Sequence, residues 1–128
     1  NLPASMAKTI LIYDDDAEIL LLCKAILSKH GFNIVTRSKC EHIEADIESC
    51  QPHLILMDLW IPDIGGEKAI ALVKENISTA AHPPILIFSA NADIKNICEK
   101  VNADGFVEKP FSINTLVDTI KFHLKEGE

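Results

Sequence analysis

The chain has 128 residues, 48% of them hydrophobic and 24% charged, and its 19 acidic residues outnumber 12 basic ones to give a net charge of −7. This length and composition indicate one globular domain, while the acidic balance without a basic run argues against a nucleic-acid surface. The longest apolar stretch is far shorter than a bilayer span, and four cysteines without Cys-x-x-Cys spacing predict a reduced, cytoplasmic protein.

The first five residues carry no pattern. Residues 1–5 precede Met6, which fits an expression remnant ahead of a native start. No basic segment followed by an apolar core opens the chain, so no signal peptide is expected. Residues 6–128 are then expected to form a single domain.

Apolar runs alternate with amphipathic segments five times along the chain. Runs without polar alternation suit strands buried on both faces of a parallel sheet. The expected elements are strand 8–13, helix 16–28, strand 33–36, a helix opening at a capping box over 38–41, strand 53–58, helix 67–77, strand 85–89, helix 92–101, strand 106–108 and a helix that follows Ser112. Five such units make an α/β fold, a three-layer αβα sandwich with a five-stranded parallel sheet in the flavodoxin-like order 2-1-3-4-5 and five helices.

Helix ends and buried faces also have sequence signals. Asp16 and Ser112 are expected to cap the first and last helices, and Asn102 to end the fourth in the left-handed conformation. The expected buried stripes are Ile19, Leu22, Cys23 and Ile26 on the first helix and Ile113, Leu116, Val117, Ile120 and Leu124 on the last.

Polar side chains follow the strands at the edge where parallel sheets bind ligands. Asp14 and Asp15 follow the first strand, Asp58 ends the third and Ser89 ends the fourth. A single acid at a strand end more often caps a helix, but three acids together with Ser89 and Lys109 favour a shared site. Crowded carboxylates resist joint ionisation, and a hard cation relieves this, so Mg²⁺ is the expected ligand.

Four short motifs stand at strand ends in the same order as in a known family. They are Asp14 and Asp15; Asp58, Leu59, Trp60, Ile61 and Pro62 with Gly66; Ser89 and Ala90; and Lys109, Pro110 and Phe111. With these motifs the chain, from about residue 8 to residue 124, resembles the receiver domain of two-component response regulators. The resemblance implies a regulatory domain that takes a phosphoryl group from a phosphohistidine donor and catalyses only its own phosphorylation and dephosphorylation.

The resemblance also implies roles for the site residues. Asp58 is the expected phospho-acceptor, and Asp15, Asp58 and the backbone carbonyl of Trp60 are expected to touch Mg²⁺, with Asp14 acting mainly through water. Lys109 and Ser89 are expected to contact the phosphoryl group, and the bond between Lys109 and Pro110 to be cis.

The resemblance implies a switch that couples Ser89 to Phe106 on the fifth strand, with the fourth helix, fifth strand and fifth helix as the expected output face. Phe106 either rotates inward on phosphorylation or is inward throughout. Trp60, two residues after the acceptor, either shields the phosphoryl group from water or contacts a partner. Both alternatives stay open at the level of sequence.

The implied partners are a sensor histidine kinase or a histidine phosphotransfer protein, and a downstream protein or an output domain. Exposed Leu21 and marginal Leu20, beside Pro110 and Phe111, are a candidate docking patch. The chain is a stand-alone receiver or part of a longer regulator, and a monomer or a phosphorylation-dependent homodimer.

Three rival functions are considered. A phosphohydrolase is disfavoured because Trp60 stands where such an enzyme is expected to carry its general acid, and a flavin module is disfavoured because no phosphate-binding loop follows the first strand. The third rival is a receiver that signals without phosphate.

Overall fold

The computed structural model describes residues 7–60, 65–76 and 82–124. The expected remnant at residues 1–5, the start at residue 6, positions 61 and 62 of the third-strand motif and the expected end of the third helix at residue 77 lie outside the described residues. Within the described ranges, no helix has both the length and the apolar character needed to cross a membrane.

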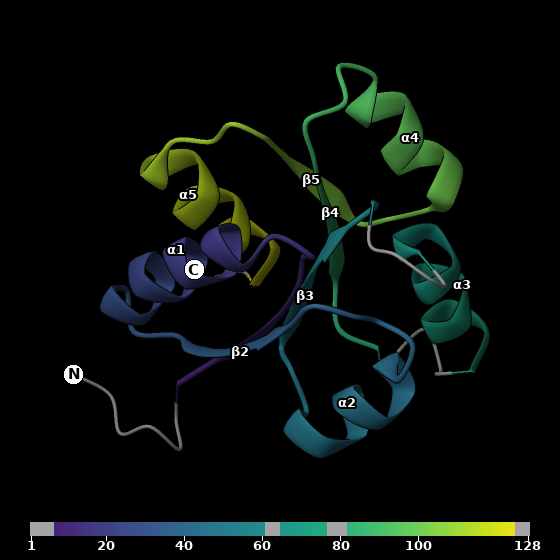
Figure 1. Ribbon diagram of the computed structural model, residues 1–128, viewed down its shortest axis with the longest axis horizontal. Helices are drawn as coiled ribbons and strands as arrows, with labels where there is room; N and C mark the ends of the chain where they lie inside the picture. The colour runs from purple at the N-terminus through teal and green to yellow at the C-terminus, as the bar shows by residue number, and fades with distance from the viewer. Residues whose placement is uncertain (1–6, 61–64, 77–81, 125–128) are drawn as a thin grey trace.

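A five-stranded parallel sheet forms the middle layer of the fold (Figure 1). The strands are β1 (Thr9–Tyr13), β2 (Asn33–Arg37), β3 (Leu54–Asp58), β4 (Ile85–Ser89) and β5 (Gly105–Glu108). They pair in the order β2-β1-β3-β4-β5, which confirms the predicted topology. The residues of β3 and β4 are all buried, as expected for apolar runs covered on both faces.

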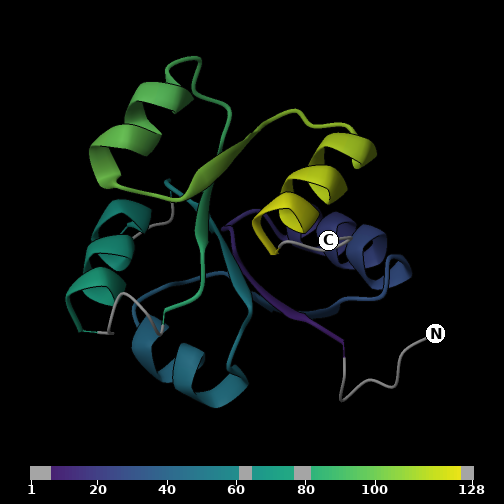
Figure 2. The ribbon, with the colours of Figure 1, turned by 180° about the vertical axis from the view of Figure 1, so that it is seen from behind.

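Helices cover both faces of the sheet. They are α1 (Ala17–Lys29), α2 (Ile43–Cys50), α3 (Gly66–Asn76), α4 (Ile94–Val101) and α5 (Ile113–Leu124). Helices α1 and α5 lie on one side, and α2, α3 and α4 lie on the other, in both views (Figures 1 and 2). The three-layer sandwich predicted from the sequence is therefore confirmed.

The alternation of side chains along the strands divides the core into two clusters. Ile12, Leu56 and Leu86 pack with α1 and α5, whereas Leu11 and Ile55 pack with the helices of the opposite layer. Two residues after Ile12 and Leu56, and therefore on the same face of the sheet, come the acids at the ends of β1 and β3. The face covered by α1 and α5 is therefore the face on which the carboxylates stand.

Local signals for helix ends were mostly reliable. The Asp16 carboxylate accepts bonds from the backbone N–H groups of Glu18 and Ile19, and Ser112 Oγ accepts from the Thr115 N–H at 3.0 Å. Asn102 ends α4 in the left-handed region at φ 60°. These contacts satisfy backbone groups that helix ends leave without a partner.

The predicted start of the second helix was wrong. Helix α2 begins at Ile43, its N-cap residue His42 makes no side-chain cap bond, and the box at residues 38–41 does not open it. Cys40 is fully buried, and its carbonyl accepts the Ile43 N–H in a turn ahead of the helix. Burial of Cys40 thus fixes this segment as a core contact and delays the helix. Helix α4 likewise begins two residues later than expected, at Ile94.

Two side chains assigned to buried stripes are exposed. Leu22 of α1 is 48% exposed and Ile113 of α5 is 53% exposed. Helix α1 packs on the sheet mainly through Cys23 and Leu27, so its rotation turns Leu22 away from the core. In α5 the buried residues begin at Leu116, about one turn after Ile113.

Candidate functional site

The site is built from the carboxyl ends of the central strands and the segment after β5. One oxygen each from Asp14, Asp15 and Asp58 lies within 4.8 Å of the others. Lys109 follows β5 directly, and its backbone N–H donates to the Ser89 carbonyl at 2.8 Å, which ties the ends of β4 and β5 together. The structure therefore gathers the acids that the sequence predicted for one edge.

Asp14 and Lys109 form a partly buried ion pair. The Lys109 ammonium donates to Asp14 Oδ2 at 2.6 Å, and the Asp16 N–H donates to Asp14 Oδ1 at 2.9 Å. The Asp14 side chain is 1% exposed and that of Lys109 19% exposed. Both oxygens of Asp14 thus already have a donor, which leaves Asp15 and Asp58 as the carboxylates with more freedom to bind a ligand.

Asp58 ends β3 almost out of contact with solvent. It is 3% exposed, and its Oδ1 accepts the Trp60 N–H at 3.2 Å. Burial raises the pKa of Asp58 to about 6, with Asp14 and Asp15 adding to the rise while the Trp60 hydrogen bond and Lys109 oppose it. At neutral pH the carboxyl is ionised yet more basic than an ordinary aspartate, a combination suited to a nucleophile.

The donor set fits a hard divalent cation. Three carboxylates and one ammonium give the site a formal charge of −2 in a small volume. Mg²⁺ prefers oxygen ligands and is commonly held by one or two carboxylates with water. Asp15 and Asp58 meet that requirement, whereas the backbone carbonyl of Trp60 stays a predicted ligand.

Ser89 and Phe106 belong to the opposite side of the sheet. Ser89 is buried, and its Oγ accepts the Asn91 N–H at 3.1 Å. The Phe106 side chain is partly buried and packs against the cluster that also holds Ile94 and Cys98 of α4. The two predicted switch residues therefore stand on the α4 side.

Gly66, part of the motif that follows Asp58, has a clear steric role. A Cβ at this position would lie 2.4 Å from the Asp58 carbonyl oxygen and 2.9 Å from the Leu59 Cα. Only glycine lets α3 begin so close to the end of β3. The Trp60 indole between these two residues is 69% exposed.

Phe88 is a neighbour of the site that the sequence did not single out. The Lys109 Nζ lies 4.5 Å from the centroid of the Phe88 ring, and the ring centroid of Phe111 lies 5.4 Å from that of Phe88. The sequence feature that could have pointed to Phe88 is its position directly before Ser89. Its meaning depended on the register of β3 and β4, which places Phe88 opposite Asp58.

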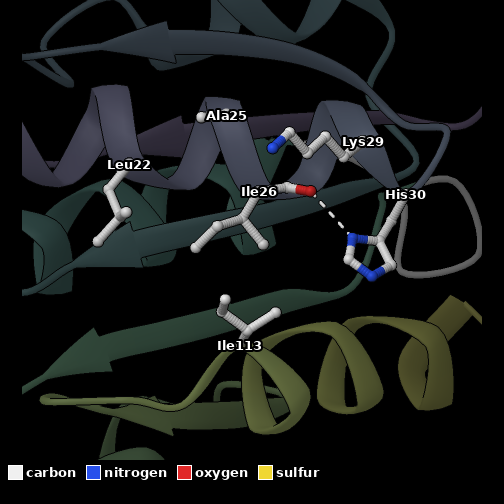
Figure 3. A pocket seen from close by; sticks show the side chains of 6 residues that line it. All are labelled: Leu22, Ala25, Ile26, Lys29, His30 and Ile113. Atoms are coloured by element: carbon white, nitrogen blue, oxygen red, sulfur yellow. Dashed lines mark hydrogen bonds between the residues drawn. The ribbon is translucent and has the colours of Figure 1, made fainter.

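An apolar hollow of about 270 Å³ separates α1 from the start of α5 (Figure 3). Leu22, Ile26 and Ile113 meet across it, and Lys29 and His30 stand at one end. Leu21, on the neighbouring surface of α1, is 70% exposed. The exposed apolar surface of this layer therefore includes Leu22 and Ile113 as well as the predicted Leu21.

The described geometry agrees with the comparisons to known proteins. The family model for the response regulator receiver domain matches residues 10–121. The nisin biosynthesis regulatory protein NisR of Lactococcus lactis subsp. lactis is 32% identical over 126 residues, covering 96% of this chain and 53% of NisR. The polar-differentiation response regulator DivK of Brucella ovis is 28% identical over 126 residues, covering 95% of this chain and 100% of DivK. The chain thus spans about half of NisR.

Solved structures give the same picture. A CheY-like response regulator receiver domain protein from Methanospirillum hungatei JF-1 is 27% identical with a TM-score of 0.81, and the match covers 94% of this chain and 95% of that one. The chemotaxis protein CheY4 of Vibrio cholerae matches with a TM-score of 0.80 over 91% of this chain and 98% of its own. At 23% identity, the likeness to CheY4 shows the fold alone.

Proposed function

The chain belongs to the response regulator receiver domain family of two-component systems, and on that premise we propose that it accepts a phosphoryl group on Asp58 from a phosphohistidine donor. The observation that carries the proposal is the buried Asp58 carboxylate, with its raised pKa, among Asp14, Asp15 and Lys109. Such a carboxylate can act as a nucleophile. The negative charge around it favours binding of a cation, or of a phosphoryl donor together with a cation.

The proposed reaction is a displacement at phosphorus. An Asp58 oxygen forms a bond to phosphorus, the phosphorus–nitrogen bond of the donor breaks, and the imidazole leaves with the electron pair and takes a proton. Mg²⁺, bound through Asp15 and Asp58, would supply positive charge to the transferring oxygens. The Lys109 ammonium adds a second positive charge, and water exclusion around the buried Asp58 strengthens both effects.

Ser89 and Lys109 would then convert the phosphoryl group into a signal. Each contributes a charge-assisted hydrogen bond of about 1.5–3 kcal/mol. Together they approach the roughly 5.5 kcal/mol that moves a population from 1:99 to 99:1. Ser89 and Phe106 lie on the α4 side of the sheet, and α5 covers the other face of β5. The output surface that we propose is therefore α4, β5 and α5.

The proposed donor surface is the apolar hollow between α1 and α5. Leu22 and Ile113 line it with exposed apolar side chains, and Leu21 is exposed on the neighbouring surface of α1. Such a surface suits a helix from a histidine kinase or a histidine phosphotransfer protein. The four cysteine side chains, three of them buried, are thiols, which supports the proposal that the protein works in the reducing cytoplasm.

Intact mass measured after incubation with Mg²⁺ and acetyl phosphate tests the proposal. We expect a single-phosphoryl adduct that is absent from Asp58→Asn and from samples with excess chelator. An adduct that persists in Asp58→Asn would contradict the assignment of the acceptor. Continuous release of phosphate from ester substrates would instead support the phosphohydrolase that Trp60 argues against.

A further inference from the structure

Phe88 stands next to the proposed nucleophile on the same face of the sheet. Asp58 and Phe88 are register partners in the parallel pair of β3 and β4. Leu56 and Leu86, two residues earlier on the same strands, are also partners and lie in the cluster covered by α1 and α5. Because side chains alternate, Asp58 and Phe88 continue that row, and the Phe88 ring is fully buried beside the carboxylate.

The ring has a cation over its face. The Lys109 Nζ lies 4.5 Å from the ring centroid while it donates to Asp14 at 2.6 Å. Phe111 packs against Phe88 at a ring-centroid distance of 5.4 Å and an interplanar angle of 48°, which helps to fix the ring. The ammonium thus has two attachments, a carboxylate and an aromatic face.

These two attachments differ in what they do to the charge of Lys109. A carboxylate pairs with the ammonium and cancels its charge, whereas a ring face attracts the cation without neutralising it. The lysine side chain is also flexible, because its stem has four methylene groups, and it loses much rotamer entropy when its ammonium is held in one place. If the ammonium leaves Asp14 to act on a phosphoryl group, the Phe88 ring is the contact that it keeps among the described residues. Without the ring, it would keep no direct contact with those residues.

We propose that Phe88 is a positioning residue for Lys109, holding the ammonium beside Asp58 by a cation–π contact when Asp14 releases it. This inference rests on the proposed function, because it gives Lys109 its role in phosphoryl transfer. It adds a requirement for an aromatic face at the position before Ser89 in this chain. Leucine of similar apolar character would fill the space without holding the charge.

The test separates the ring face from the ring volume. Site-specific pentafluorophenylalanine at position 88 keeps the shape of the ring and reverses the charge of its face, and Phe88→Leu removes the ring. The same fluorinated residue at Phe32, a buried core position of the same cluster, is the matched control. Phosphorylation by acetyl phosphate with Mg²⁺ is measured over a range of donor concentrations, and urea unfolding verifies that each variant is folded.

Both Phe88 variants should lower the maximal rate of phosphorylation by about 2- to 30-fold, the span of a cation–π contact from exposed to desolvated sites. The donor concentration for half-maximal rate should change little, because the ammonium acts on the transferring group. The control at Phe32 should match the wild type. In the unphosphorylated protein, the Lys109 ε-methylene protons should show an upfield ring-current shift that Phe88→Leu removes.

Normal rates in the fluorinated variant, with a slow Phe88→Leu, would mean that only packing matters and would overturn the inference. Normal rates in both would do the same while leaving the proposed function intact. A wild-type protein that gains no phosphoryl group would overturn the proposed function and this inference together. If Phe88→Leu does not fold, the fluorinated variant, which conserves volume, still decides.

Discussion

The Asp58→Asn substitution tests the electrostatics of the site through the stability of the fold. Burial, reinforced by Asp14 and Asp15, raises the pKa of Asp58 from its ordinary value of 3.8 to about 6. The folded protein therefore holds a proton on Asp58 over a pH range in which the unfolded chain has lost it. The stabilisation from that proton is complete below the unfolded pKa and is lost as the pH rises through about 6.

The size of the effect follows from the shift. About two pKa units, at roughly 1.36 kcal/mol each, make the ionised Asp58 cost about 3 kcal/mol of folding free energy above the folded pKa. Asparagine has nearly the same shape as aspartic acid and no charge. Asp58→Asn should therefore be more stable than the wild type by about 3 kcal/mol near pH 8 without added metal, and by almost nothing near pH 4.

Urea unfolding of both proteins at several pH values between about 4 and 8, with chelator present, measures this difference. Asp118→Asn on the exposed side of α5 removes a charge outside the site and should change stability by less than about 0.5 kcal/mol at every pH. A stability gap at Asp58 that is absent near pH 8, or that grows toward acid pH, would refute the electrostatic reasoning.

Four further substitutions probe other parts of the structure. Gly66→Ala places a Cβ against the Asp58 carbonyl and should lower the unfolding free energy by about 1–3 kcal/mol in urea titrations; unchanged stability would mean that α3 can move away freely. Leu22→Glu should slow transfer from a phosphohistidine donor protein by about tenfold and spare acetyl phosphate, while Leu21→Glu should have a smaller effect; equal losses with both donors would contradict the docking surface. Trp60→Ala should shorten the phosphoryl lifetime several-fold, measured as loss of the adduct with time, and an unchanged lifetime would assign the indole to partner contacts instead.

The topology was predictable because the buried strands carry an unambiguous pattern. The runs that end at Tyr13, Asp58 and Ser89 have no polar alternation, and this implies a parallel sheet covered on both faces. The edge that gathers the acids follows from the same fact, since parallel strands end on the same side. The resemblance then supplied the expectation of a cis bond between Lys109 and Pro110, which the structure contains.

The rotation of helices and the contacts between side chains were not predictable in this way. Leu22 and Ile113 fit an apolar stripe by spacing, yet spacing does not determine how a helix is rotated against the sheet, and that rotation exposes both. The box at residues 38–41 has the residue types of a helix cap, but burial of Cys40 took precedence over the local preference. The place of Lys109 over Phe88 depends on the register of β4 and β5, which one sequence does not encode locally.

The end of β4 has a consequence for how such a protein can diverge. Phe88 and Ser89 are neighbours in the chain, yet strand alternation sends the first toward α1 and α5 and the second toward the layer of α4. The thickness of one sheet therefore separates the surroundings of Phe88 from those of Ser89. A substitution at residue 88 would repack against α1 and α5, whereas one at residue 89 would repack toward α4, so each position can change with little rearrangement of the opposite layer while the carboxylates at the edge stay the same.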